Sequence, residues 1–212
     1  MRQVITNIED ALKRLYLIDT PYSAEHFLLP SETDATSVAS ATQQGALLIK
    51  GTHDDLSVGI FLSPEIRRIL AGITDWNPNQ WSHEEFQAFM VAAEEISHFH
   101  YLVFHASNGR QLTQLELEVQ GEIDKFFLSC FASHSIDFER MFEALFYRFR
   151  LADGLAPEQR SRYEETNRLA RQFVLKYGRP LLLQPSRREQ TFRLLRRFYR
   201  LGGAEKLSLI GT

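Results

Sequence analysis

Residues 82–132 read SHEEFQAFMVAAEEISHFHYLVFHASNGRQLTQLELEVQGEIDKFFLSCFA, and this stretch decides the fold. It holds two capping boxes, which begin helices by satisfying the first backbone amides: Ser82 with Glu85, and Thr113 with Glu116. Asn108 and Gly109 tolerate the left-handed conformation in which helices commonly end. The pattern therefore predicts two long helices, over 83–107 and 113–132, joined by a short loop into an antiparallel pair.

Further helix starts appear on both sides of this pair. They are Thr6 with Glu9, Ser63 with Pro64, and Ser186 with Glu189. We expect Gly72 to end the helix that starts at Ser63 in the left-handed conformation. Apolar periodicity predicts two more helices, one from Phe138 to Phe149 and one with Pro157 in its first turn. The chain is thus expected to be mainly α with a small β-hairpin (α+β), a bundle of six to seven helices.

The β-hairpin is expected near the N-terminus, at about 46–62. Apolar residues alternate with others from Leu56 to Leu62, after a turn-like segment, and Ala46–Lys50 form a facing run. A two-stranded ribbon is marginal in water, so it should lie on a helix or gain a strand, for which Leu181–Leu183 is a candidate. Residues 30–44 are expected to form a loop.

The charge of the chain is divided unevenly along its length. The net charge is −3 over 212 residues, yet residues 1–144 carry 9 Lys+Arg against 21 Asp+Glu, and residues 145–212 carry 15 against 6. We expect an acidic region over 1–152 and a basic region over 153–212, with the joint at 153–157, packed as one globular unit. The two regions either neutralise each other or leave the basic one for an acidic partner.

The composition also restricts the cellular setting. A single cysteine, Cys130, excludes an intrachain disulfide framework and a paired-cysteine zinc or redox motif, which favours a reducing compartment. The first residues lack the apolar stretch of a secretion signal, and no apolar run reaches bilayer length. The expected location is therefore cytoplasmic, with no transmembrane segment.

The paired helices carry polar stripes that could face each other. If they do, carboxylates would converge on one imidazole, in a ligand mix suited to a divalent transition metal or to proton transfer. The residues concerned are Glu94, Glu95, His98, Glu118 and Glu122. Solvated helix faces are the alternative, because neither a second ExxH step nor an HExxH motif is present. His100 is expected to be a hydrogen-bonded core histidine, and Trp76 and Trp81 are expected to brace the start of the 83–107 helix.

The other candidate site is a run of arginines near the end of the chain. Arg193, Arg196, Arg197 and Arg200 recur at i, i+3, i+4 and i+7, which gathers them on one helical face; we name these four the arginine stripe. Arginine suits bidentate contacts to phosphate or carboxylate. Glycine-rich phosphate loops and a GxSxG elbow are absent.

We therefore favour the hypothesis of a non-catalytic interaction module for nucleic acid or an acidic protein. Its contact residues would be Arg187, Arg188, Arg193, Arg196, Arg197 and Arg200. A metal-binding protein or metal-dependent enzyme, built on the stripes of the paired helices, is the second hypothesis. The residues specify neither a substrate, a cofactor nor an oligomeric state.

Overall fold

The computed structural model describes residues 1–30, 44–52, 55–132, 138–148 and 155–211. Most of the expected 30–44 loop, the hairpin turn and part of the 153–157 joint lie outside these residues. The mainly α fold with a hairpin near the N-terminus is confirmed. In chain order the elements are α1 (Arg2–Tyr16), β1 (Gly45–Thr52), β2 (Asp55–Leu62), α3 (Pro64–Gly72), α4 (His83–Ser107), α5 (Gln114–Ala132), α6 (Phe138–Phe142), α7 (Pro157–Phe173), α8 (Arg179–Leu182), α9 (Arg188–Arg200) and α10 (Gly203–Gly211).

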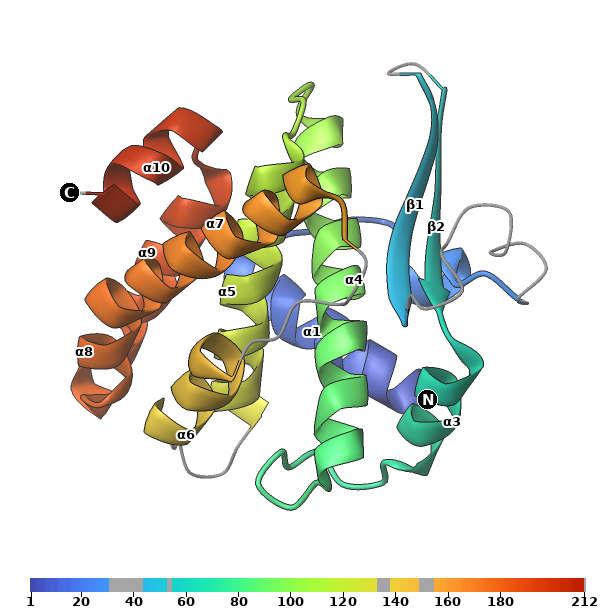
Figure 1. Cartoon of the computed structure of the whole chain (residues 1–212), viewed down its shortest axis with the longest axis horizontal. Coiled ribbons are helices and arrows are strands. Elements are labelled where there is room, and N and C mark those ends of the chain that lie inside the picture. The colour runs from blue at the N-terminus through green and yellow to red at the C-terminus, as the bar shows by residue number, and fades with distance from the viewer. Residues whose placement is uncertain (31–43, 53–54, 133–137, 149–154, 212) are drawn as a thin grey trace.

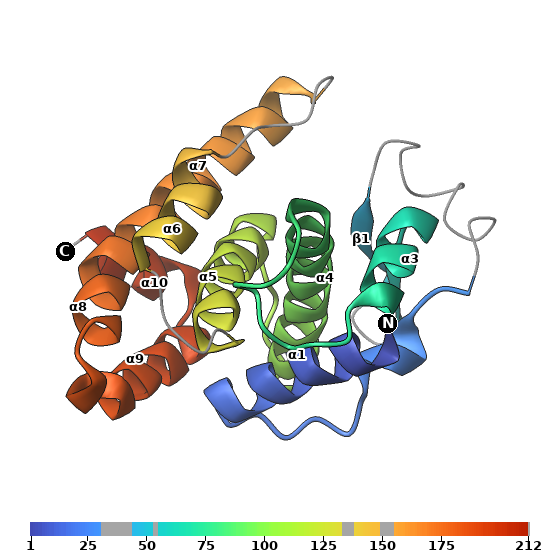
Figure 2. The same cartoon turned by 90° about the horizontal axis from the view of Figure 1, so that it is seen from below.

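The predicted helix pair, α4 and α5, forms the centre of the molecule (Figure 1). The hairpin and α3 lie on the outer side of α4, while α7, α8, α9 and α10 lie beyond α5 (Figures 1 and 2). Helix α1 crosses the pair and also contacts α9 (Figure 2). This arrangement places the arginine-bearing α9 against the end of α1, and the polar stripes of α4 and α5 against each other.

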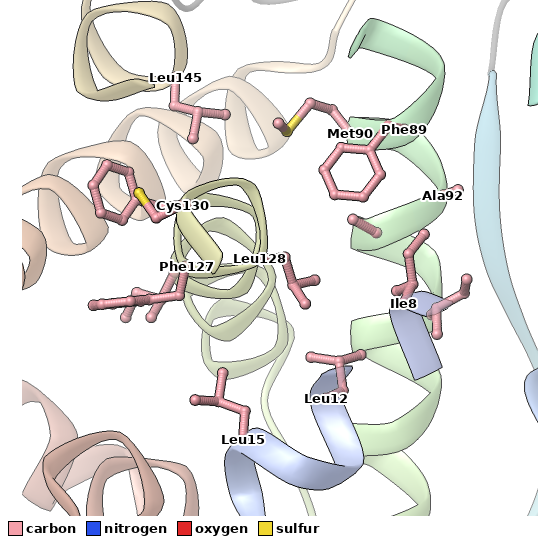
Figure 3. Packing of buried hydrophobic residues seen from close by; sticks show 14 of the residues in the cluster. Ile8, Leu12, Leu15, Phe89, Met90, Ala92, Phe127, Leu128, Cys130 and Leu145 are labelled. Atoms are coloured by element: carbon pink, nitrogen blue, oxygen red, sulfur yellow. The ribbon is translucent and has the colours of Figure 1, made fainter. Parts of the chain in front are cut away.

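One cluster of buried side chains connects most of these elements. It extends from Val4 in α1 to Ile210 in α10 and is rich in phenylalanine. Figure 3 shows its middle, where Leu12 of α1 and Leu128 of α5 lie between α4 and α5, and Leu15 of α1 lies below α5. Because α1 and α5 bury apolar side chains in the same cluster, the two helices are held in fixed positions relative to each other.

The hairpin pairs as predicted, and it packs on a helix. β1 and β2 are antiparallel, with Gly45 opposite Leu62, and both contact α4. Gly45 permits this close approach, because a Cβ there would lie 2.6 Å from Cγ1 of Val91. Additional pairing comes from Leu28, which bridges Ile60 in parallel. The prediction of a third strand at Leu181–Leu183 is wrong, because residues 179–182 form helix α8.

Of the five predicted helix starts marked by a Ser or Thr cap, three are confirmed. Ser82 and Glu85 make both bonds of a capping box at the start of α4. Thr113 and Glu116 exchange the same two bonds at the start of α5. The hydroxyl of Ser63 accepts a hydrogen bond from the Ile66 amide at the start of α3.

The other two starts, and one helix end, are wrong. Helix α1 begins at Arg2, so Thr6 and Glu9 lie within it. Helix α9 begins at Arg188 after a 3₁₀ turn, without a side-chain cap from Ser186. Gly72 keeps a negative φ and Ile73 continues in an extended conformation, whereas Gly109, after α4, does adopt φ 68°.

Candidate functional site

Two members of the arginine stripe donate hydrogen bonds to the end of α1. Arg196 Nε donates to the carbonyl oxygen of Leu15 at 3.0 Å, and Arg200 Nη2 donates to that of Tyr16 at 2.9 Å. These carbonyls belong to the last turn of α1, where the helix has no amide partners for them and where its dipole favours a cation. The two guanidiniums thus cap α1, a role that spacing within α9 alone does not predict.

The remaining arginines of the predicted contact set face outward. Arg187, Arg188, Arg193 and Arg197 are all exposed. The side chain of Arg193 is 73% exposed and its Nε lies 3.9 Å from Glu189, whereas that of Arg196 is 22% exposed. Within the described ranges, neither Arg187 nor Arg197 has a carboxylate at ion-pair distance. Four outward guanidiniums therefore remain at and along α9.

Arg188, one of these arginines, lines a groove between α1, the end of α5 and the start of α9. It has a volume of about 350 Å³, and Arg14 of α1 and Arg188 of α9 both line it. The Arg188 guanidinium lies 5.7 Å from the ring centres of Phe131 and Phe192. The other residues that line the groove are mainly apolar: Ala11, Leu15, Trp76, Leu128, Phe131, Ala132 and Phe192. An apolar groove with cations along it suits a ligand that is both apolar and acidic.

The polar stripes of α4 and α5 do face each other. His98 Nδ1 lies 3.7 Å from Glu95 Oε2, and His98 Nε2 lies 3.9 Å from Glu118 Oε2. We name Glu94, Glu95, His98, Glu118 and Glu122 the imidazole–carboxylate cluster. Lys125 adds a cation to it, since its Nζ donates to Glu94 Oε2 at 2.8 Å and to Glu122 Oε1 at 2.7 Å. All five predicted residues are thus brought together, and most are buried.

The charged groups of this cluster shift one another's pKa values. Burial disfavours the His98 imidazolium, but the carboxylates of Glu95, Glu118 and Glu94 outweigh that effect and raise the pKa of His98 to about 9. Burial raises the pKa of Glu118 to about 6. Burial also acts to raise the pKa of Glu94, yet Lys125 and His98 hold it below its usual value. The site can therefore keep negative charge at Glu94 and a proton on His98.

The other singled-out residues are in the core. His100 is fully buried, but in the described part of the chain neither ring nitrogen has a hydrogen-bond partner, so the prediction of a hydrogen-bonded core histidine is wrong on that point. Its nearest carboxylate oxygen, on Glu9, is 3.9 Å from Nε2. Trp76 and Trp81 both pack on Phe89 near the start of α4, as expected.

Sequence reasoning missed a second buried polar network on the other side of α5. Asp124 accepts hydrogen bonds from Tyr16, from Ser97 at 2.5 Å and from Gln120 at 2.9 Å. Lys206 of α10 donates to Gln120 Oε1 at 2.8 Å. The place of Asp124 close to Ile123, Phe126 and Phe127 is the available signal, because a buried carboxylate requires donors. Gln120 is a local partner, but Tyr16, Ser97 and Lys206 come from three other elements and leave no local pattern.

Comparison with known proteins adds no relative to this description. No protein-family model, curated protein or solved structure matches the chain. Within the described residues, no helix combines the length and apolar character needed to cross a bilayer.

Proposed function

We propose that this chain is a non-catalytic interaction module that binds an acidic partner through the outward arginines of α9. The observation that carries the proposal is the groove that Arg14 and Arg188 both line. Its apolar lining offers anchoring area to a leucine or an aromatic side chain, and the guanidiniums beside it complement carboxylates. Acidic protein segments combine both features, whereas a nucleic-acid backbone presents phosphates without aliphatic anchors.

Selection from a random peptide library displayed on phage tests this proposal without a known partner. We expect enrichment of peptides in which Asp or Glu flank an apolar residue, and binding that weakens as salt is added. A 20-nucleotide single-stranded DNA serves as the competing probe. Stronger, salt-sensitive binding of that DNA would move the proposal to nucleic acid.

Two variants with equal loss of charge separate the outward arginines of α9 from general basicity. The first replaces the four outward arginines by glutamine: Arg187, Arg188, Arg193 and Arg197. The control replaces four arginines that already pair with carboxylates elsewhere: Arg2, Arg148, Arg168 and Arg179. At about 0.2–1 kcal/mol for each exposed charge pair, the first variant should lose roughly fourfold to several hundredfold in affinity. Equal losses in both variants would refute a specific surface.

A further inference from the structure

Three side chains of α4 and α5, away from the arginines of α9, bring atoms that could bind a metal ion close together. One side-chain ligand atom each of Glu94, His98 and Glu118 lies within 4.8 Å of the other two. Glu94 and His98 are one turn apart on α4, and Glu118 comes from the facing helix. Ligand atoms around one ion lie at most about 4.4 Å apart, given bonds of about 2.0–2.2 Å. Small side-chain rotations of Glu94, His98 and Glu118, which we name the triad, would therefore bring the three ligand atoms within bonding distance of one ion.

His98 supplies the observation that points to a ligand. The residue is 5% exposed, and within the described structure its buried Nε2 has no hydrogen-bond partner. That nitrogen is directed to the α5 side, where Glu118 Oε2 lies 3.9 Å away. A buried polar nitrogen without a hydrogen-bond partner lowers the stability of the fold. The position of this nitrogen next to two carboxylates therefore indicates a ligand that the chain itself does not provide.

Gly121 makes the space in which this nitrogen lies. A Cβ at this position would be 2.7 Å from His98 Nε2 and 3.1 Å from His98 Cδ2. Any side chain on α5 there would press on the imidazole edge that faces Glu118. Glycine is unfavourable inside a helix by about 0.5–1 kcal/mol relative to alanine, so its position in α5 has a steric reason.

Lys125 and Arg162, the cations next to the triad, each leave a carboxylate oxygen of Glu94 or Glu118 that can coordinate an ion. Lys125 binds Oε2 of Glu94, and a carboxylate has a second oxygen that can coordinate. Arg162 Nε lies 4.0 Å from Glu118 Oε1, the oxygen other than the one nearest His98. The Glu94 side chain is 27% exposed, which gives an ion a path from solvent.

We propose that His98 Nε2, on release of its proton, and one oxygen each from Glu94 and Glu118 bind a divalent transition-metal ion between α4 and α5. Imidazole with carboxylates is a ligand mix used for zinc, iron and manganese rather than for calcium or magnesium, which prefer oxygen alone. Three protein ligands leave at least one position for water, as in open zinc sites. Lys125 and Glu122 then remain as a neighbouring ion pair.

Equilibrium dialysis of the untagged full chain against Zn²⁺ and Mn²⁺, with Mg²⁺ as the hard-ion comparison, tests the site. We expect one transition-metal ion per chain and no competition by Mg²⁺. His98→Gln and Glu118→Gln should each weaken binding by more than the 10–100-fold typical for loss of an outer partner. Glu122→Gln is the matched control, a carboxylate of the same cluster outside the triad, and should cost less than about tenfold.

Two measurements protect the test against variants that fail to fold. Gly121→Ala removes no ligand, yet its methyl group should abolish binding by blocking His98 Nε2. In the unchanged protein, nitrogen NMR should show Zn²⁺ shifting the ring resonances of one among the seven histidines. Binding that survives in His98→Gln and Glu118→Gln, equal loss in Glu122→Gln, or titration without a histidine shift each overturns the proposal.

Discussion

Replacement of Lys206 by methionine is the sharpest test of the described interior. Lys206 is 2% exposed, and its Nζ lies 4.4 Å from the ring centres of both Tyr101 and Phe198. Burial lowers the pKa of Lys206 to about 7 from a usual value of 10.5, although Asp124 opposes the shift. Methionine keeps the length and the apolar stem and removes the titrating group.

The sign and size of the effect follow from linkage between protonation and folding. Between pH 7 and 10.5 the unfolded chain binds more protons at Lys206 than the native chain does, so the free energy of unfolding rises with pH in this window. Integration from pH 7.0 to 9.0 gives a rise of about 2 kcal/mol from this residue. The Lys206→Met variant lacks this contribution, so its stability relative to the original chain should fall by that amount.

Urea unfolding at pH 7.0 and 9.0, followed by far-UV circular dichroism at constant ionic strength, measures this difference. His98, with a pKa of about 9, also titrates in the window, but it does so in both proteins and cancels in the comparison. Lys176→Met controls for loss of an exposed lysine that donates to Leu209 O of α10. A difference that stays flat, or grows in the opposite direction, would show that Lys206 is not buried as described.

Three further stability changes are expected, each measured by the same urea method. Arg200→Ala should cost about 1 kcal/mol because the last carbonyls of α1 lose a charged donor, whereas exposed Arg193→Ala should stay within about 0.5 kcal/mol; equal effects would contradict the capping role. Tyr16→Phe should cost about 1–3 kcal/mol, since buried Asp124 loses a donor, and a neutral result would mean that this donor is dispensable. Ser82→Ala should cost about 1 kcal/mol through loss of the α4 cap, unless the start of α4 is held by packing alone.

Local signals predicted the fold where the deciding interactions are themselves local. The capping boxes at Ser82 and Thr113 act within three residues, and both form. The same pattern misled at Thr6, because Glu9 turns instead to Lys13 and to the amide of Ala24. A side chain that has a partner elsewhere in the fold is not available as a cap, and the sequence pattern does not reveal that competition.

The same difference between local and long-range interactions applies to the two candidate sites. The imidazole–carboxylate cluster could be predicted because helix periodicity and a short connection determine which residues of α4 and α5 face each other. The structure places His98 against Gly121, the residue before Glu122 in α5. The arginine stripe was predicted as one helical face, but the sequence could not predict which of its arginines bind the end of α1 and which face outward. Arg196 reaches Leu15, a residue 181 positions away, and no helical spacing encodes that contact.

The two polar networks around α5 differ in one respect that bears on function. Asp124 receives donors from Tyr16, Ser97 and Gln120, so this buried charge is satisfied by the chain itself and serves to fix how α1, α4 and α5 pack. In the cluster on the other face, His98 Nε2 and Glu95 Oε2 are buried without hydrogen-bond partners in the described residues.

Apolar side chains would hold the helix pair at lower cost than an incompletely satisfied ionic cluster, because buried charges lose more in hydration than they regain without full pairing. Packing alone therefore explains the first network but not the second. That difference is why the metal proposal rests on His98, and why Gly121→Ala, which leaves every ligand in place, is its most direct test.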